Sequence, residues 1–431
     1  MMNARPTYRF LAACTASLVL LVLLATVVRA YRHRQEPAEP RIPVRLNETL
    51  TNATSDSLMP PGFDAKVREY MRYWALRGVS LSVMRNDSLL IAKGYGKADE
   101  GVQMQPGHIL RISSVSKLVT AVGIMLLQEE GKLSLDDRVF GEDGLLNDST
   151  FNAAIADSNY YKITVEQLLR HKGGFSRRGG DPMFSTRWIM MQNRLKTVPT
   201  AEQLVRIQLA QPVAFEPGTW QGYSNFGYLL LSMIIERLEG VPYEEFIRTR
   251  VLEPCGCVGF RTAGNYYKDK HPDEVRYYVQ KDDQPVNEFN NSGRMVPRCY
   301  GGNNIEGLSG AGFWVASTPE LALLVASIDG RPEVPDLLSP ESVAAMTEYF
   351  DPDTYSLGWN DTKPTGEWTR TGTFAGTSAL VKYYPDGECW IFVTNTSTYK
   401  GPGLAHFTAE LFDTLRAEYA DALPRRNLFY D

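Results

Sequence analysis

Apolar residues alternate with polar ones in two pairs of short segments, one pair toward each end of the chain. Segments 79–85 and 88–95 lie on either side of Asn86-Asp87, and this arrangement predicts a β-hairpin. Segments 378–384 and 389–394 flank a Pro-Asp-Gly turn and predict a second hairpin. Both ends of the chain therefore contribute strands.

Between the hairpins the apolar residues recur at helical spacing. Two capping-box patterns, Thr164-x-x-Gln167 and Thr200-x-x-Gln203, begin predicted helices, and further helices are predicted over 63–77 and 406–420. Strands at both ends and helices in the middle predict an α+β fold, an α/β sandwich. We expect an antiparallel sheet built from both ends of the domain, flanked by helices, with an inserted all-helical lobe at about 137–240.

The first 61 residues differ in composition from the rest. Phe10 to Val28 form an apolar stretch of about 19 residues, long enough to cross a bilayer as a helix. Residues 35–61 contain five prolines and few large apolar groups, which is typical of an extended, disordered stalk. We therefore divide the chain into a cytoplasmic tip with a membrane segment (1–34), the stalk, and one large domain (62–431).

Two interpretations of the apolar stretch remain open. The first is a signal anchor that crosses the membrane once and leaves the domain on the extracellular or lumenal side. The second is a cleaved signal peptide, because Val28-Arg29-Ala30 resembles a small-residue cleavage site, and the protein would then be secreted. The length of the stretch and the arginine at its edge favour the anchor. Basic residues lie on both sides, with more after the stretch, so the positive-inside rule does not support a lumenal domain.

Seven Asn-x-Ser/Thr sequences favour a secretory route. Asn395 ends a predicted strand, so we do not expect it to be glycosylated. The expected sites of N-glycosylation are Asn47, Asn52, Asn86, Asn147, Asn290 and Asn360.

The cysteines permit a disulfide outside the membrane segment. Cys14 lies in the apolar stretch, which leaves Cys255, Cys257, Cys299 and Cys389. Cys255 and Cys257 are too close in sequence to pair comfortably, so a bond between Cys257 and Cys299 is one expectation. Buried free thiols are the alternative.

Composition and residue spacing argue against two classes of function. The net charge is −5 and the pI is near 5.7, so nothing indicates a nucleic-acid partner. The five histidines are scattered, and no pair has the spacing of metal ligands. We therefore expect neither a metal nor another cofactor.

Ser114-Val-Ser-Lys117 begins a long apolar run, 118–127, that predicts a buried helix. A serine three residues before a lysine at a helix start places hydroxyl and amine on one face, one turn apart. The positive end of the helix faces the same place and favours developing negative charge. This arrangement suits a serine nucleophile whose proton is taken by a lysine. A second Ser-x-x-Lys, at 397–400, follows a strand and runs into Gly-Pro-Gly, so it lacks this context.

Tyr223-Ser-Asn225 precedes another apolar helix. In an extended stretch, positions two apart project to the same side, so the phenol and the carboxamide can enter one cleft. A tyrosine there exchanges protons if nearby cations lower its pKa. Taken alone, the segment also fits a helix-capping loop with a packing tyrosine.

Arg370-Thr-Gly-Thr373 lies on a predicted strand beside the C-terminal hairpin. Its glycine, Gly372, would let a substrate backbone approach closely, and Arg370 could hold a carboxylate. The Thr373 N–H could complete an oxyanion hole with the Ser114 N–H. Taken alone, this segment also fits an ordinary strand.

In this order, Ser-x-x-Lys, Tyr-x-Asn and a basic-Thr-Gly triplet resemble the motifs of the serine β-lactamase and D,D-peptidase superfamily. The closest resemblance is to the branch that contains class C β-lactamases, penicillin-binding proteins and esterases, and it covers about 63–415. Segments 163–174, 215–218 and 312–321 also resemble that branch.

The resemblance implies a role for each of these residues. Ser114 attacks a carbonyl carbon to form an acyl-enzyme, and Lys117 and Tyr223 share the general base and acid work. It also implies four substrate-binding residues: Asn225, Arg370, Thr371 and Gly372. Asn225 holds either the substrate amide or Lys117.

Arg370 departs from the family pattern, because most members have lysine or histidine at that position. Arginine keeps the positive charge but does not exchange a proton at neutral pH. The resemblance therefore carries over an electrostatic role for this residue and not a proton-relay role.

The sequence thus predicts a membrane-anchored or secreted serine hydrolase of the peptidase, esterase or lactamase type. Its substrate is expected to be a small molecule, an ester or a peptide, cleaved at an amide or ester bond. The alternative is a catalytically weak or inactive protein of the same fold that serves as a binding or scaffolding module.

Overall fold

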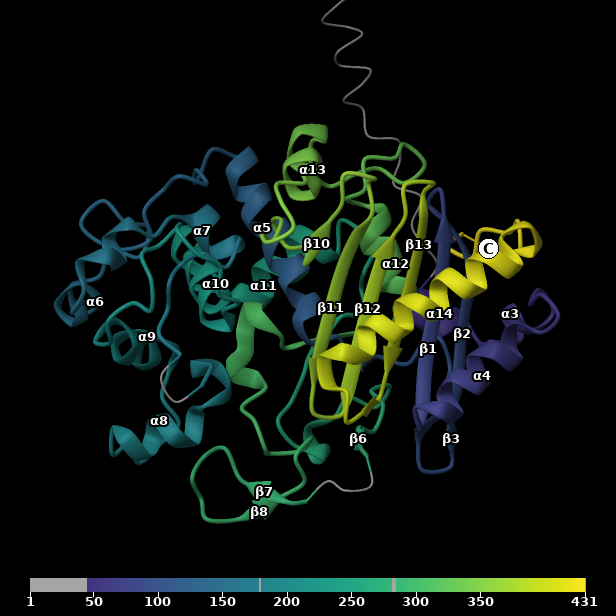
Figure 1. Cartoon of the computed structure of the whole chain (residues 1–431), viewed down its shortest axis with the longest axis horizontal. Helices are drawn as coiled ribbons and strands as arrows, with labels where there is room; N and C mark the ends of the chain where they lie inside the picture. Colours follow the sequence, from purple (N-terminus) through teal and green to yellow (C-terminus); the bar gives the residue numbers. More distant parts are fainter. Residues whose placement is uncertain (1–44, 178–179, 281–283, 431) are drawn as a thin grey trace, which may run out of the picture. The chain divides into compact units, whose positions relative to one another are not determined.

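A seven-stranded antiparallel sheet lies at the centre of the computed structural model, which describes residues 45–177, 180–280 and 284–430 (Figure 1). In spatial order the strands are β10 (Asp361–Thr362), β11 (Trp368–Phe374), β12 (Thr377–Tyr383), β13 (Glu388–Thr394), β1 (Gly78–Arg85), β2 (Ser88–Asp99) and β3 (Val102–Gln103). β1 pairs with β13, with Val83 opposite Trp390, so the two predicted hairpins join in the middle of the sheet. The predicted α+β fold with a sheet built from both ends is confirmed.

Helices α4 (Phe63–Tyr73) and α14 (Leu404–Tyr419) cover one face of this sheet (Figure 1). Phe63 and Val67 of α4 share a buried core with Phe412 and Leu415 of α14, and Trp390 from the sheet lies in the same core. These positions are four and three residues apart along their helices, which is the spacing that places side chains on one helical face.

Helix α12 (Thr318–Ala326) packs on the opposite face. Ser80 and Ser82 of β1 both contact the Thr318 hydroxyl, at 2.8 and 2.9 Å. They alternate with Leu81 and Val83, which belong to the core under α4 and α14, as expected for a strand buried on both faces. Helix α5 (Ser116–Glu129) follows the predicted nucleophile and is buried at 11 of its 14 residues.

Between residues 149 and 239, apart from residues 178 and 179, the regular elements of the structure are helical. They are α6 (Ser149–Ala154), η2 (Ser158–Lys162), α7 (Val165–Leu169), η3 (Pro182–Phe184), α8 (Thr186–Gln192), α9 (Ala201–Leu209) and α10 (Asn225–Glu239). Both capping boxes form, because the Thr164 and Thr200 side chains accept from the backbone of Gln167 and Gln203.

Short elements connect the sheet to the rest of the domain. They are β4 (Leu110–Arg111), η1 (Ser113–Val115), α11 (Tyr243–Ile247), η4 (Arg248–Leu252), β5 (Arg261–Thr262), η5 (Tyr267–Asp269), β6 (Tyr278–Val279), β7 (Val286–Asn287), β8 (Met295–Val296), η6 (Glu306–Ala311), β9 (Trp314–Ala316), α13 (Pro340–Thr347), β14 (Thr396–Ser397), η7 (Gly401–Gly403) and η8 (Ala420–Ala422). β4 and β5 both pair with β9, which fixes the strand before the nucleophile.

Residues 45–61 are not an extended stalk. They include α2 (Leu46–Thr49) and α3 (Asn52–Asp56), and Leu46 and Leu50 are buried. The Asn52 side chain accepts from Gly94 N at 2.8 Å and donates to Met104 O at 2.8 Å. Tertiary contacts therefore order a segment whose composition alone predicted disorder.

The predicted membrane segment, 10–28, and the first part of the predicted stalk, 35–44, lie outside the residues that the structure describes. Within residues 45–430, apart from the two short gaps, no helix is both long and apolar enough to span a membrane.

The asparagines of the sequons differ in accessibility. Asn395 is fully buried and its Nδ2 donates to Lys97 O and Arg276 O, which agrees with the expectation that it carries no glycan. The amide nitrogens of Asn47 and Asn52 are also bonded within the fold. Asn86 and Asn147 are exposed, and the Asn147 Nδ2 donates to Glu142 O at 2.8 Å. Glycosylation at the six expected positions stays a prediction.

The predicted disulfide between Cys257 and Cys299 is wrong in this structure. Cys257 is a buried thiol whose Sγ lies 3.3 Å from Glu320 O. The Cys299 Sγ lies against a different segment, 3.6 Å from Tyr277 O. The alternative of buried thiols therefore describes these cysteines, and burial raises the pKa of the Cys257 thiol well above its usual value.

Candidate active site

Ser114 lies on the single turn η1, which leads directly into α5. Ser113 has a φ of 51°, in the left-handed region that serine seldom adopts. Lys117 Nζ lies 3.2 Å from the Ser114 Oγ, and the Tyr223 hydroxyl lies 2.8 Å from the same atom. The structure thus brings together the three residues that were predicted to be catalytic.

Lys117 is fully buried, and its amine has further oxygen partners. Nζ donates to Asn225 Oδ1 at 2.7 Å and to Ala311 O at 2.6 Å, besides its contact with the nucleophile. Burial, followed by the positive charge of Arg370, lowers the pKa of Lys117 well below its usual value, while Asp181 opposes that shift. The environment therefore favours a neutral amine.

Asn225 is held at both ends of its carboxamide. Ser224, the residue before it, is extended (φ −137°, ψ 120°), so Tyr223 and Asn225 project to the same side as predicted. Asn225 Oδ1 accepts from Lys117, and Nδ2 donates to Asp181 Oδ2 at 2.9 Å. Asn225 was expected to hold either the substrate or the lysine, and in the structure its Oδ1 accepts from Lys117. Asp181 was not predicted, because no local sequence pattern connects it with the motifs.

The His171 ring packs against the ring of Tyr223. The two ring centres lie 4.3 Å apart, and the His171 Nδ1 accepts from Ser224 N at 3.2 Å. Burial lowers the pKa of His171 well below its usual value, which favours the neutral ring, and the bond accepted by Nδ1 favours the tautomer with its proton on Nε2. Burial also raises the pKa of Tyr223, and the charge of Arg370 opposes that rise.

Arg370 lies beneath the nucleophile with no exposed surface. Its Nε donates to Ser114 O at 2.8 Å. A substrate carboxylate cannot reach a fully buried guanidinium, so the structure does not support the expectation that Arg370 holds a carboxylate. The charge of Arg370 acts instead on Lys117 and Tyr223, whose pKa values it lowers.

Gly372 allows β11 to pack directly on the nucleophile turn. A Cβ at this position would lie 2.2 Å from Ile112 O and 3.0 Å from Ser114 N. Such contacts leave no room for any side chain, which explains the glycine. We expected Gly372 to make room for a substrate backbone. In the structure the space beside it is filled by the backbone of Ile112 and Ser114.

The outer edge of β11 carries the amide predicted for the oxyanion hole. Thr369 O accepts from Asn360 N, and Thr371 N donates to Asn360 Oδ1 at 2.6 Å, so alternate residues of β11 turn their amides away from β12. By the same alternation the Thr373 N–H points outward, beyond the end of β10. This orientation supports the predicted pairing of the Thr373 and Ser114 N–H groups.

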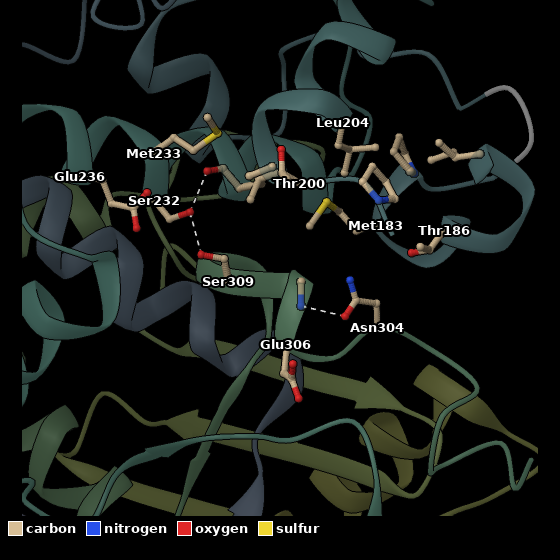
Figure 2. Close-up of a pocket in the computed structure, with 16 residues that line it drawn as sticks. Met183, Thr186, Thr200, Leu204, Ser232, Met233, Glu236, Asn304, Glu306 and Ser309 are labelled. Carbon is tan, nitrogen blue, oxygen red and sulfur yellow. Dashed lines mark hydrogen bonds between the residues drawn. The ribbon is translucent and has the colours of Figure 1, made fainter. Parts of the chain in front are cut away.

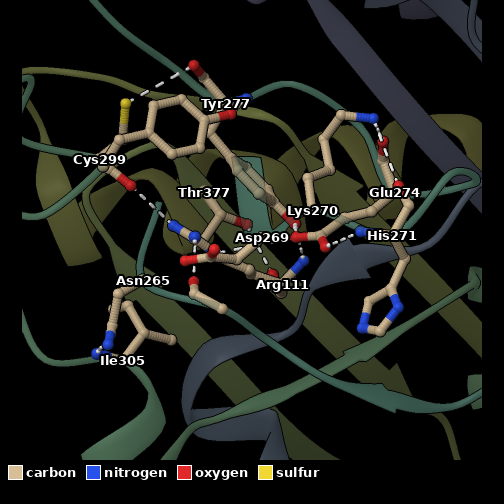
Figure 3. A network of polar contacts seen from close by, with 12 residues as sticks. Arg111, Asn265, Asp269, Lys270, His271, Glu274, Tyr277, Cys299, Ile305 and Thr377 are labelled. Carbon is tan, nitrogen blue, oxygen red and sulfur yellow. Dashed lines mark hydrogen bonds and ion pairs between the residues drawn. The ribbon is translucent and has the colours of Figure 1, made fainter. Parts of the chain in front are cut away.

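A buried network fixes the strand before the nucleophile (Figure 3). Arg111 donates to Cys299 O at 2.9 Å and to Gly264 O at 2.8 Å. Its backbone N–H donates to the Tyr277 hydroxyl at 2.8 Å, which in turn donates to Glu274 at 2.7 Å. These contacts tie β4 to the segment between residues 264 and 299, so the nucleophile three residues later rests on a rigid support.

Two grooves each contain one of the predicted site residues. We name them by the site residue that each contains. The Tyr223 cleft, about 910 Å³, is lined among others by Lys172, Trp220, Tyr223, Tyr349, Tyr355 and Asn360. The Thr373 groove, about 680 Å³, is lined among others by Phe184, Val279, Val286, Phe374, Tyr399 and Pro402.

A smaller cavity of about 190 Å³ contains none of the predicted site residues (Figure 2). It lies between the helical lobe and η6, where Ser309 bonds to Ser232 at 2.9 Å. Ser309 has a φ of 44°, another left-handed serine. The cavity adjoins the site through η6, where Ala311 accepts from Lys117, and through Pro182, which follows Asp181.

The β-lactamase family model matches residues 63–412, which is most of the chain. Among curated relatives, the putative penicillin-binding protein PbpX of Bacillus subtilis (strain 168) is 24% identical over 330 residues, covering 75% of this chain and 71% of that protein. A putative D-alanyl-D-alanine carboxypeptidase of Escherichia coli (strain K12) is 24% identical over 360 residues, covering 77% and 79%. Another penicillin-binding protein of Bacillus subtilis is 27% identical over 188 residues, and this chain spans only 37% of its length.

Solved structures show the same fold. The D-amino acid amidase from Ochrobactrum anthropi SV3 has a TM-score of 0.64 at 20% identity, covering 84% of this chain and 99% of that chain. An octameric penicillin-binding protein homologue from Pyrococcus abyssi has a TM-score of 0.58 at 23% identity, covering 83% and 78%. With the family match over residues 63–412, these findings show that the chain belongs to the β-lactamase family of serine hydrolases.

Proposed function

We propose that the protein hydrolyses an amide or ester bond through an acyl-enzyme formed on Ser114. One observation carries this proposal: the same hydroxyl oxygen is contacted by a buried amine, Lys117 Nζ at 3.2 Å, and by a phenol, Tyr223 at 2.8 Å. A nucleophile with both a base and an acid within hydrogen-bond reach is what acyl transfer requires.

Lys117 is the base for the attack. A neutral amine has two N–H groups and one lone pair, and the two N–H groups are directed at Asn225 Oδ1 and Ala311 O. The lone pair is then left for the Ser114 hydroxyl, whose proton it accepts. The lowered pKa favours the neutral form of the amine that this step needs.

Tyr223 passes the proton on to the leaving group. The protonated lysine is disfavoured by burial and by the nearby charge of Arg370, so the proton does not stay on the amine. The Tyr223 hydroxyl accepts it while donating its own proton to the departing nitrogen or oxygen. The carbonyl oxygen gains negative charge during the attack, and the N–H groups of Ser114 and Thr373 stabilise it.

Water completes the cycle through the same groups. It attacks the acyl-enzyme ester, gives its proton to the amine, and Ser114 regains a proton as the acid product leaves. Removal of a positioned general base typically lowers such rates by about 10²- to 10⁴-fold.

The proposal is tested with the full-length chain and p-nitrophenyl acetate. We expect hydrolysis that is abolished by Ser114→Ala and falls at least about 100-fold with Lys117→Ala. Mass spectrometry after treatment with a fluorophosphonate should show one adduct, on Ser114. The matched control is Ser397→Ala, in the second Ser-x-x-Lys, which should leave both results unchanged.

The second candidate function is a binding module that has lost activity. Its support is the replacement of the usual lysine or histidine by Arg370. Absence of both turnover and adduct in a protein with a normal unfolding transition would favour it over the hydrolase.

We also propose that the domain lies outside the cytosol, anchored by the apolar stretch at residues 10–28 or released after its cleavage. The apolar length and the exposed Asn86 and Asn147 sequons support this location. Peptide-N-glycosidase treatment of the expressed protein should lower its apparent mass if the domain enters the secretory route, and an unchanged mass would contradict it.

A further inference from the structure

We propose that the acyl group accepted by this site is apolar and uncharged, and that it occupies the Thr373 groove. This inference rests on the proposed function. It names the class of substrate: esters or amides of aliphatic or aryl carboxylic acids, without an acylamino or carboxylate group beside the scissile carbonyl.

The direction of the acyl group follows from the proposed acid and oxyanion donors. Tyr223 protonates the leaving atom, so the leaving group departs into the Tyr223 cleft. The carbonyl oxygen points to the N–H groups of Ser114 and Thr373. The remaining substituent of the carbonyl carbon then extends along the end of β11, where Thr373 and Phe374 line the groove.

Three residues that were expected to bind the acyl side, Asn225, Arg370 and Thr371, are engaged within the protein. The Thr371 N–H and hydroxyl both donate to Asn360 Oδ1. The Asn225 carboxamide donates one Nδ2 hydrogen to Asp181 at 2.9 Å and accepts from Lys117 at 2.7 Å, and the residue is buried, so both of its ends are directed at the protein. Arg370 has no exposed surface and cannot pair with a substrate carboxylate. An acyl group with such polar substituents would lose its bonds to water and gain none from these residues.

The groove itself offers apolar contacts. Phe184 and Tyr399 are exposed, and Val279, Val286 and Phe374 are partly exposed, so these side chains are free to cover a ligand. Arg298 is the one charged residue among the described lining residues. It already has an interaction within the protein.

The volume fits a group much larger than acetyl. A groove of about 680 Å³ lies within the usual range of small-molecule sites, roughly 300–1,000 Å³. Each methylene that leaves water for such a surface strengthens binding, so we expect kcat/KM to rise about two- to fourfold per added methylene until the groove is filled.

The test uses the full-length chain and a series of esters with one leaving group. The p-nitrophenyl esters of acetate, butanoate and hexanoate vary the apolar length. The p-nitrophenyl ester of N-acetylglycine adds an acylamino group, and the mono-p-nitrophenyl ester of succinate adds a charge. We expect kcat/KM for hexanoate to exceed that for acetate by about 16- to 250-fold, and both polar esters to be hydrolysed more slowly than butanoate.

Two variants in the Thr373 groove test whether this groove causes the preference for longer acyl chains. In Phe184→Ala/Tyr399→Ala the ratio of hexanoate to acetate should fall at least about fivefold, and Val279→Asp should lower it further. Both removed aromatic side chains are exposed, so the fold should tolerate their loss. The matched control is Trp188→Ala, an exposed aromatic outside both grooves, which should leave the ratio unchanged.

The outcomes separate this inference from the proposed function. Ser114-dependent hydrolysis with a flat acyl series, or with preference for the N-acetylglycine or succinate ester, overturns the inference and leaves the hydrolase intact. No Ser114-dependent turnover of any ester overturns both. A steep series that the groove variants do not alter would place the acyl group elsewhere and also overturn it.

Discussion

At the scale of single residues, Lys117 lies between two charges of opposite sign. Arg370 lowers its pKa, as burial does, and Asp181 raises it. The sequence could predict Ser114, Lys117 and Tyr223 as a group, because helical spacing and motif order are local properties. It could not predict Asp181, whose contact with Asn225 exists only after η3 has folded beside α10.

Removal of the negative charge should move the pH profile toward acid. In Asp181→Asn the pKa of Lys117 falls further, so the neutral base persists at lower pH and the acid limb of kcat/KM shifts to lower pH. We also expect kcat to fall about 10- to 100-fold, because the Asn225 carboxamide loses its charged partner. Asp181→Glu, which keeps the charge, should restore the wild-type limb, and an unchanged limb in Asp181→Asn would contradict the assignment.

Removal of the positive charge of Arg370 should shift the acid limb of the kcat/KM profile to higher pH. In Arg370→Gln the pKa of Lys117 rises, because a nearby cation no longer disfavours the protonated amine. The acid limb of kcat/KM should then shift to higher pH, measured with the same ester over pH 5 to 9. A shift in the same direction as in Asp181→Asn would show that structural disturbance, and not charge, controls the profile.

At the scale of elements, sequence patterns predicted the helices and strands that are stabilised by interactions between neighbouring residues. The hairpins and both capping boxes depend on neighbouring residues, and they form as expected. The segment at 45–61 failed as a stalk, because its helices are held by contacts with β2 and α12 that no window of sequence contains. The Cys257–Cys299 bond failed for the same reason, since pairing depends on where two distant segments lie.

The contact between β11 and η1 can be tested with one methyl group. Gly372→Ala puts a Cβ 2.2 Å from Ile112 O, so β11 must move away from the nucleophile turn. We expect a loss of about 1–3 kcal/mol in the free energy of unfolding and a large fall in kcat. The matched control is Gly403→Ala, where nothing lies within 4 Å of the added Cβ and stability should hold. Equal effects of the two substitutions would argue against the close packing.

At the scale of the whole molecule, a buried acid pair should make stability depend on pH. Asp87, at the turn of the β1–β2 hairpin, accepts from Val334 N at 3.2 Å and faces Asp329. Burial, then the charge of Asp329, raises the pKa of Asp87 to about 8. The folded state therefore holds a proton that the unfolded chain releases near pH 4.

This proton uptake fixes the sign of the effect. A carboxyl group with a raised pKa contributes stability that is fully present below its unfolded pKa and is lost as pH rises through about 8. We expect the free energy of unfolding to decline between pH 4 and 8, and Asp87→Asn to flatten that decline by at least about 1 kcal/mol. Asp143→Asn, on an exposed loop, is the control, and identical slopes for wild type and Asp87→Asn in urea titrations would contradict the prediction.

The pairing of β1 with β13 has a consequence for how the protein is made. The partners of residues 79–85 are residues 388–394, so the central strand of the sheet leaves the ribosome only when nearly the whole chain has been synthesised. At about 5–20 residues per second, the first hairpin waits roughly 15 to 60 s for its neighbour. During that interval the edge of β1 lacks its strand partner, so we expect the nascent hairpin to be prone to aggregation until residues 388–394 emerge.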